Sequence, residues 1–119
     1  MPKNSTNKIE LPEFIRLSHY RIKLIKINSH ICYEIGEQQG SFHSKQMIIY
    51  LDEDIIEEGG SIAVDLVKHE LLHAIYYVRQ LEGKNEEDTV NGMATHYTEI
   101  EKNNPDYVRW QLNNLNERI

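Results

Sequence analysis

The chain has 119 residues, with 13 Lys and Arg against 19 Asp and Glu, and a net charge of −6. This length allows one domain with a single modest core. The negative charge argues against a protein that binds nucleic acid by neutralising phosphates. The single cysteine, Cys32, excludes an internal disulfide, and no apolar run reaches the ~18–20 residues of a membrane span. The six histidines are the unusual feature of this acidic chain.

Residues 1–10 are polar and show no periodicity, so we expect a flexible leader before a single domain over 11–119. The leader lacks the apolar core of a signal peptide. Together with the lone Cys32, which fits reducing conditions, this favours a cytoplasmic protein.

The first half of the chain has the residue pattern typical of strands. Residues 21–27 alternate polar and apolar, and residues 31–35 follow a turn signal at Asn28-Ser29, so both segments predict strands. Cys32, in the second segment, is expected to be a small buried hydrophobe. Residues 36–44 contain two glycines and mostly polar side chains, which predicts a loop.

The apolar run at residues 47–51 is rich in β-branched and aromatic side chains and predicts a buried strand. Two positions in the sheet are open to it. At an edge beside a cleft it would accept an extended peptide as a further strand, whereas its apolar character favours a place inside the sheet.

The second half has helical periodicity. Residues 62–81 predict the longest helix, with Ser61 as its N-cap and Gly83 as its stop. Residues 86–102 predict a second helix with an apolar stripe. After a break at Pro105, residues 107–119 predict a weaker helix. The stripe residues are Val90, Met93, Ala94, Tyr97 and Ile100, and the last helix is expected to turn Val108, Leu112 and Leu115 inward. Strands followed by helices indicate an α+β fold.

The long helix contains His69-Glu70-Leu71-Leu72-His73, the H-E-x-x-H pattern. Residues four apart lie on one face of a helix, so both imidazoles can reach one metal ion. Zinc accepts imidazole nitrogens, and the intervening glutamate can take a proton from the metal-bound water. Polar side chains in a half-buried helix need partners, which a metal supplies. The alternative is that both histidines simply lie on the solvent side.

A catalytic zinc needs a third protein ligand. A continuation with Gly at position 76 and His at 79 is absent, because the chain has Tyr76 and Arg79. Carboxylates at the start of the next helix, Glu86 and Glu87, remain. We favour Glu87, because Asn91 one turn later can accept a hydrogen bond from a liganding histidine. Glu86 stays open, and both carboxylates could merely stabilise the positive end of the helix.

Two segments carry a resemblance to a known family, and they read His69-Glu70-x-x-His73 and Glu87-x-x-Val90-Asn91-x-Met93-Ala94. They resemble the gluzincin pattern and, more closely, small phage and prophage zincin-like proteins related to the ImmA/IrrE and SprT-like metallopeptidases. Asn104-Pro105 and Trp110 add to a resemblance that covers about residues 45–112. It implies a minimal zincin-like fold, with a small N-terminal sheet packed on the active-site helix and two further helices. It also implies one zinc ion per chain, peptide-bond hydrolysis, and a phage- or prophage-encoded protein in a bacterial host.

We therefore expect a zinc-dependent metallopeptidase, with zinc held by His69, His73 and Glu87 and with Glu70 as the general base. Its partner would be a peptide or protein substrate, with a weak preference for basic segments allowed by the acidic balance; no nucleic-acid or membrane partner is expected. The candidates for a donor to the oxyanion are Tyr76, Tyr77, His96 and Tyr97. For each of them a structural role is the more usual one. The alternative is a catalytically silent zinc-binding module that binds a regulatory protein, and a metal-free domain is the third reading.

Overall fold

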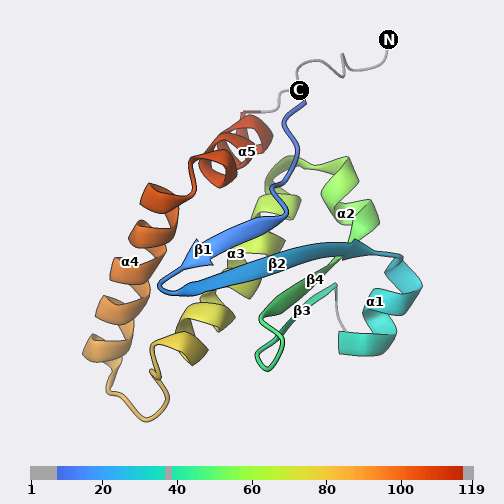
Figure 1. Cartoon of the computed structure of the whole chain (residues 1–119). Coiled ribbons are helices and arrows are strands. Elements are labelled where there is room, and N and C mark those ends of the chain that lie inside the picture. The colour runs from blue at the N-terminus through green and yellow to red at the C-terminus, as the bar shows by residue number, and fades with distance from the viewer. Residues whose placement is uncertain (1–7, 37–38, 117–119) are drawn as a thin grey trace.

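In the computed structural model, which describes residues 8–36 and 39–116, a sheet lies on one side of a long central helix (Figure 1). The strands are β1 (Phe14–Leu17), β2 (Tyr20–Ile27), β3 (Gly40–His43) and β4 (Ile48–Asp52). Their order is β1-β2-β4-β3, with β2 and β4 parallel and the two outer pairs antiparallel. The fold is therefore α+β, as the sequence predicts.

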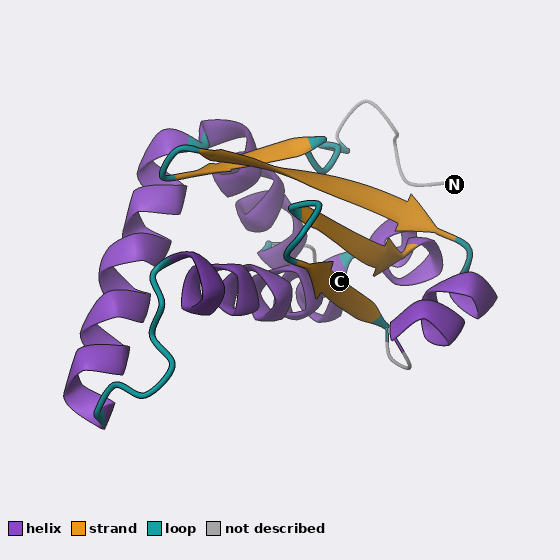
Figure 2. Ribbon diagram, turned by 60° about the horizontal axis from the view of Figure 1, so that its bottom comes forward, coloured by secondary structure: helices purple, strands orange, loops and turns teal. Residues whose placement is uncertain are grey.

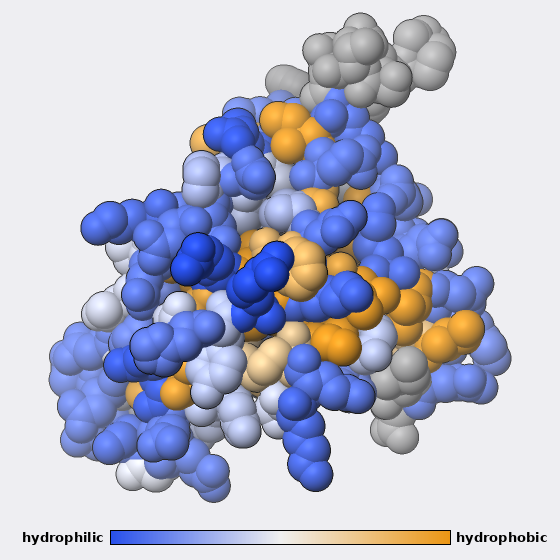
Figure 3. Space-filling model, viewed as in Figure 1, coloured by the Kyte–Doolittle hydropathy of each residue, from blue (hydrophilic) through white to orange (hydrophobic). Residues whose placement is uncertain are grey.

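Five helices accompany this sheet in the described residues, namely α1 (Ser29–Gly36), α2 (Glu53–Glu58), α3 (Gly60–Val78), α4 (Glu86–Asn103) and α5 (Pro105–Leu115). Figure 2 shows the two layers, with α3 along one face of the sheet, and α4 and α5 beyond its β1 side. The opposite face is the one seen in Figure 3, where hydrophilic side chains surround a band of apolar ones over the sheet. None of the described helices combines the length and apolarity that a membrane crossing requires.

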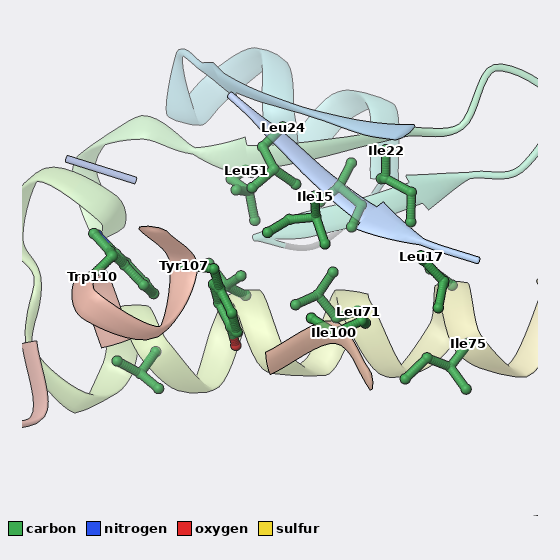
Figure 4. Close-up of a cluster of buried hydrophobic side chains, with 14 of the residues drawn as sticks. Ile15, Leu17, Ile22, Leu24, Leu51, Leu71, Ile75, Ile100, Tyr107 and Trp110 are labelled. Carbon is green, nitrogen blue, oxygen red and sulfur yellow. The ribbon is translucent and has the colours of Figure 1, made fainter. Parts of the chain in front are cut away.

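The core lies between the sheet, α3 and α5 (Figure 4). Alternate residues of β1 and β2 point into it, which is the period expected of a half-buried strand. On α3 the buried residues recur at helical spacing. The largest fully buried apolar side chains are Tyr107, Ile15, Leu17, Ile22, Ile49, Leu51, Leu71, Ile75 and Ile100.

Two predictions for the first half are wrong. Residues 31–35 belong to helix α1, because Asn28 caps a helix instead of closing a turn: its Oδ1 accepts the His30 N–H at 2.8 Å, and its carbonyl accepts the Cys32 N–H at 2.8 Å. Cys32 is buried as expected, but in a helix. Within the predicted loop at 36–44, residues 40–43 form strand β3, because pairing with β4 satisfies their backbone whatever their polarity.

The strand at Ile48–Asp52 lies inside the sheet, between β2 and β3. Its apolar run therefore indicated its position correctly, and the edge position is excluded for it. The edge beside α3 belongs to β3, which contacts that helix.

The helix ends differ from the predicted ones by a few residues. Helix α3 begins at Gly60, and its N-cap is Gly59 rather than Ser61, because the Asn114 side chain accepts the Gly60 N–H at 2.9 Å. It ends at Val78, and Gln80 takes the left-handed backbone conformation expected of Gly83. Helix α4 matches its prediction closely.

The predicted inward faces of the last two helices are partly wrong. Val90 is 54% exposed on α4, and Leu112 and Leu115 are about half exposed on α5. In their place Tyr107 and Trp110 are buried, because α5 begins at Pro105, two residues early, and packs against α3. The first seven residues of the predicted leader and the last three of the final helix lie outside the described residues.

Candidate metal centre

The two histidines of the motif lie side by side on the exposed face of α3, opposite the residues that pack into the core. Their rings meet nearly edge to face, and the Nε2 atoms of His69 and His73 are 3.2 Å apart. The helical spacing of four residues is the cause, since it stacks one side chain above the other.

This separation fits a shared metal ion. Two imidazole nitrogens bound to one tetrahedral zinc at 2.0–2.1 Å are about 3.3 Å from each other. A hydrogen bond between two neutral imidazoles also has this length. Both arrangements need neutral rings, and burial together with the charge on His69 lowers the pKa of His73.

Glu70 points in a different direction from its two neighbours. It is 2% exposed, and it lies on the side of α3 that faces β3, where a Cβ at Gly40 would lie 3.3 Å from its Cγ. Its carboxylate has no hydrogen-bond or ion-pair partner within the described part of the chain. Burial raises its pKa, while the charge on His69 acts in the opposite direction. No buried side-chain oxygen or nitrogen of the described residues lacks a partner, so the Glu70 oxygens are open to solvent-accessible space. An acid whose pKa is raised at such a position is a candidate for a functional role.

The Glu70 side chain reaches a cavity of about 360 Å³ between α3 and β3, which we call the Glu70 cavity. One histidine of the motif, His73, also lines it, so the acid and a ring nitrogen border the same space. Its lining residues are Ser41, Phe42, Ser44, Glu70, His73, Tyr76 and Tyr77.

The third ligand is not assembled. Glu86 and Glu87 are exposed in the first turn of α4, beside the N-cap Asn85, and Asn91 is exposed one turn on. Across residues 8–36 and 39–116, no three His, Cys, Asp or Glu side chains converge in a group that could hold a metal. The structure thus brings His69 and His73 together without Glu87, whose ligand role stays a prediction.

Strand β3 and the residue after it contribute three of the seven lining residues, in a segment for which the sequence predicts a loop. Ser41, Phe42 and Ser44 come from this segment. The available signal was a short alternation, in which Ser41 and His43 bond to each other at 3.0 Å while Phe42 packs edge-on against Tyr77 of α3.

Other candidates take structural positions. The Tyr97 hydroxyl bonds the Tyr107 hydroxyl at 2.6 Å and Gln111 at 2.9 Å, away from the cavity lining, and the His96 Nδ1 bonds the Gly92 carbonyl at 2.8 Å. Tyr76 and Tyr77 alone of the four oxyanion candidates line the Glu70 cavity. Comparisons of the chain with protein-family models, curated proteins and solved structures found no match.

Proposed function

We propose that this protein is a zinc-dependent peptide hydrolase of the zincin-like kind, with His69, His73 and Glu87 as metal ligands and Glu70 as the general base. One observation carries the proposal: the Glu70 side chain is packed against β3, and its carboxylate opens into a cavity beside two converging imidazole nitrogens. By resemblance, the protein belongs in the cytoplasm of a bacterial host, as the product of a phage or prophage.

Glu70 would move the proton in this reaction. Bound zinc would supply a Lewis acid and a water molecule of lowered pKa. A carboxylate oxygen of Glu70 would accept a proton from the attacking water and later deliver it to the nitrogen of the leaving amine. The raised pKa of Glu70 suits both halves of this role. A group that must act first as a base and then as an acid works best when its pKa lies near the operating pH.

The open edge of β3 offers a place for the substrate backbone. The Gln39 carbonyl accepts the Asp52 N–H, so in this antiparallel pair Gly40 and Phe42 direct their N–H and C=O groups away from β4. Within the described residues these groups have no hydrogen-bond partner. An extended peptide added to β3 would therefore pass along the Glu70 cavity.

Metal content tests the proposal first. The purified protein should hold about one zinc ion per chain, and His69→Ala or His73→Ala should lose it, whereas the control His43→Ala should retain it. Comparing Glu87→Ala with Glu86→Ala for zinc affinity identifies the third ligand. Quenched fluorescent peptides should be cleaved by the zinc-loaded protein; a protein that neither binds zinc nor gains thermal stability from it contradicts the proposal.

A catalytically silent zinc-binding module is the second candidate. The exposed Tyr76 and Tyr77 beside the histidines favour it, because tyrosine is enriched in protein interfaces. The unpartnered Glu70 speaks against it, since a purely structural zinc site needs four ligands and no base. If Glu70→Gln keeps both zinc and biological effect, the module is correct.

A further inference from the structure

A second cavity of about 550 Å³ adjoins the Glu70 cavity at the C-terminal end of α3, and we call it the tyrosine cavity. Tyr76 and Tyr77 line both cavities, so one extended ligand can enter both. Its lining residues are Tyr20, Tyr76, Tyr77, Val78, Gln80 and Glu82. We propose that the tyrosine cavity is a subsite for a lysine or arginine side chain of a peptide bound along β3. This inference rests on the proposed function for the identity of the ligand as a peptide.

Three tyrosines give this cavity its aromatic walls. Tyr20, Tyr76 and Tyr77 are 44%, 38% and 53% exposed, which is a large aromatic surface to leave in water. The ring of Tyr77 is held by Phe42, whose ring centroid is 6.1 Å away. Ring faces of tyrosine attract ammonium and guanidinium groups, and their flat sides also cover the methylene stem of such a chain.

The charge of the cavity selects a cation. Glu82 is the only charged side chain among the lining residues of the described chain, and no described cation forms an ion pair with it. The last turn of α3 contains no basic residue, so the negative end of the helix dipole adds to the same field. Arg79 follows that turn as the C-cap but does not line the cavity.

The turn after α3 holds Glu82 at the cavity. Gln80 adopts a positive φ of 53°, which reverses the chain, and the Leu81 N–H bonds the Tyr76 carbonyl at 3.0 Å. Leu81 is then 6% exposed and packs against Gly92 of α4, where a Cβ would lie 2.8 Å from its Cδ2. Because Leu81 is held in the core, the backbone of the next residue, Glu82, is held in place beside the tyrosine cavity, which the Glu82 side chain lines.

Fluorescence anisotropy with synthetic peptides tests this subsite. The probes are labelled octapeptides of alanine and threonine in which one lysine is moved through each position, with norleucine as the neutral partner of the same stem length. In at least one position the lysine peptide should bind about three- to tenfold more tightly than its norleucine partner. Glu82→Gln should lower the ratio of lysine-peptide to norleucine-peptide affinity about threefold, and Tyr20→Leu should lower it by a similar factor.

The controls separate this inference from the proposed function. Glu58→Gln removes the same charge at the opposite end of α3 and should leave the preference intact. His73→Ala tests the metal site, and the lysine preference should persist in it even if zinc binding and cleavage prove absent. Equal binding of lysine and norleucine peptides, or a lysine preference unchanged by Glu82→Gln, would each overturn the subsite.

Discussion

Strands β1 and β3 are the two edges of the same sheet, and they differ in the hydrogen bonds made by their outward backbone groups. On β1, Asn104 accepts the Arg16 N–H at 2.8 Å and donates to the Arg16 carbonyl at 2.9 Å, as a neighbouring strand would. On β3, the outward groups of Gly40 and Phe42 have no partner among the described residues. A side chain thus covers the Arg16 position of one edge, whereas the other edge stays open beside the Glu70 cavity.

The buried polar groups differ in the same way. On the α5 side, the hydroxyls of Tyr97 and Tyr107 and the side-chain oxygen of Gln111 lie 2.6 to 2.9 Å from one another. The two hydroxyl protons make two of these three contacts as hydrogen bonds at any one time. On the β3 side, the Glu70 carboxylate is left without a partner. No buried side-chain oxygen or nitrogen of the described residues lacks a partner, so the Glu70 oxygens open to the Glu70 cavity. The α5 side therefore uses its polar groups for stability, whereas the Glu70 carboxylate remains available to a ligand.

Replacing Glu70 should have the largest effect. Glu70→Gln should lower peptide cleavage by about 10²- to 10⁴-fold, the usual share of a general base, while zinc stays bound. The same variant should unfold at a higher temperature than the wild type, because a neutral amide is less costly to bury than an unpartnered carboxylate. Cleavage kinetics and calorimetry measure the two effects; a less stable variant would show that Glu70 is structural.

Opening the closed edge should have the next largest effect. Asn104→Ala should lower the free energy of unfolding by about 1–3 kcal/mol, because it leaves Arg16 and the Ile100 carbonyl without their bonds. Urea denaturation measures the loss, and light scattering should detect association through the exposed edge. The exposed neighbour Asn103 is the control, and Asn103→Ala should change little. If Asn103→Ala and Asn104→Ala lower the free energy of unfolding equally, the Asn104 side chain does not stabilise the β1 edge.

A methyl group at Gly40 sharpens the comparison from the open side. Its Cβ would lie 3.1 Å from Leu66 Cδ1 and 3.3 Å from Glu70 Cγ. Gly40→Ala should therefore lower stability by about 1 kcal/mol and reduce cleavage by up to about 10²-fold through displacement of the base. Gly83→Ala is the matched control. Its positive φ of 83° costs roughly 1 kcal/mol, but cleavage by it should stay near the wild-type rate.

The smallest effect is expected far from both edges. Hydrogen bonds from Lys26 and Lys8 lower the pKa of Glu57. The stabilisation is therefore present above the pKa of the unfolded chain and is lost as the pH falls through the lower folded value. Since both partners are exposed, Glu57→Gln should cost less than about 1 kcal/mol near neutral pH and nothing in strong acid. Thermal unfolding across this pH range checks the sign, with Glu58→Gln as the control.

Local signals predicted the three long helices better than the strands, whereas the short helices α1 and α2 were not predicted. The apolar stripe of residues 86–102 and the break at Pro105 identified α4 within one residue, because these signals act over a few neighbouring positions. Residues 31–35 and 40–43 were assigned wrongly, since a short apolar segment suits helix and strand alike and a polar segment becomes a strand only when a partner pairs with it. The prediction that Leu112 and Leu115 point inward was wrong for a related reason, because the contact with α3 decides which face of α5 is buried.

That His69 and His73 share one face of a helix while Glu70 points in another direction is already set by their spacing, since it follows from the helical repeat alone. Three features depend on the folded chain: β3 forms the open edge, the Glu70 side chain packs beneath it, and Glu86 and Glu87 lie apart from the histidines. Those features depend on pairing and packing between residues distant in the chain, and such contacts leave no periodic trace in any one segment.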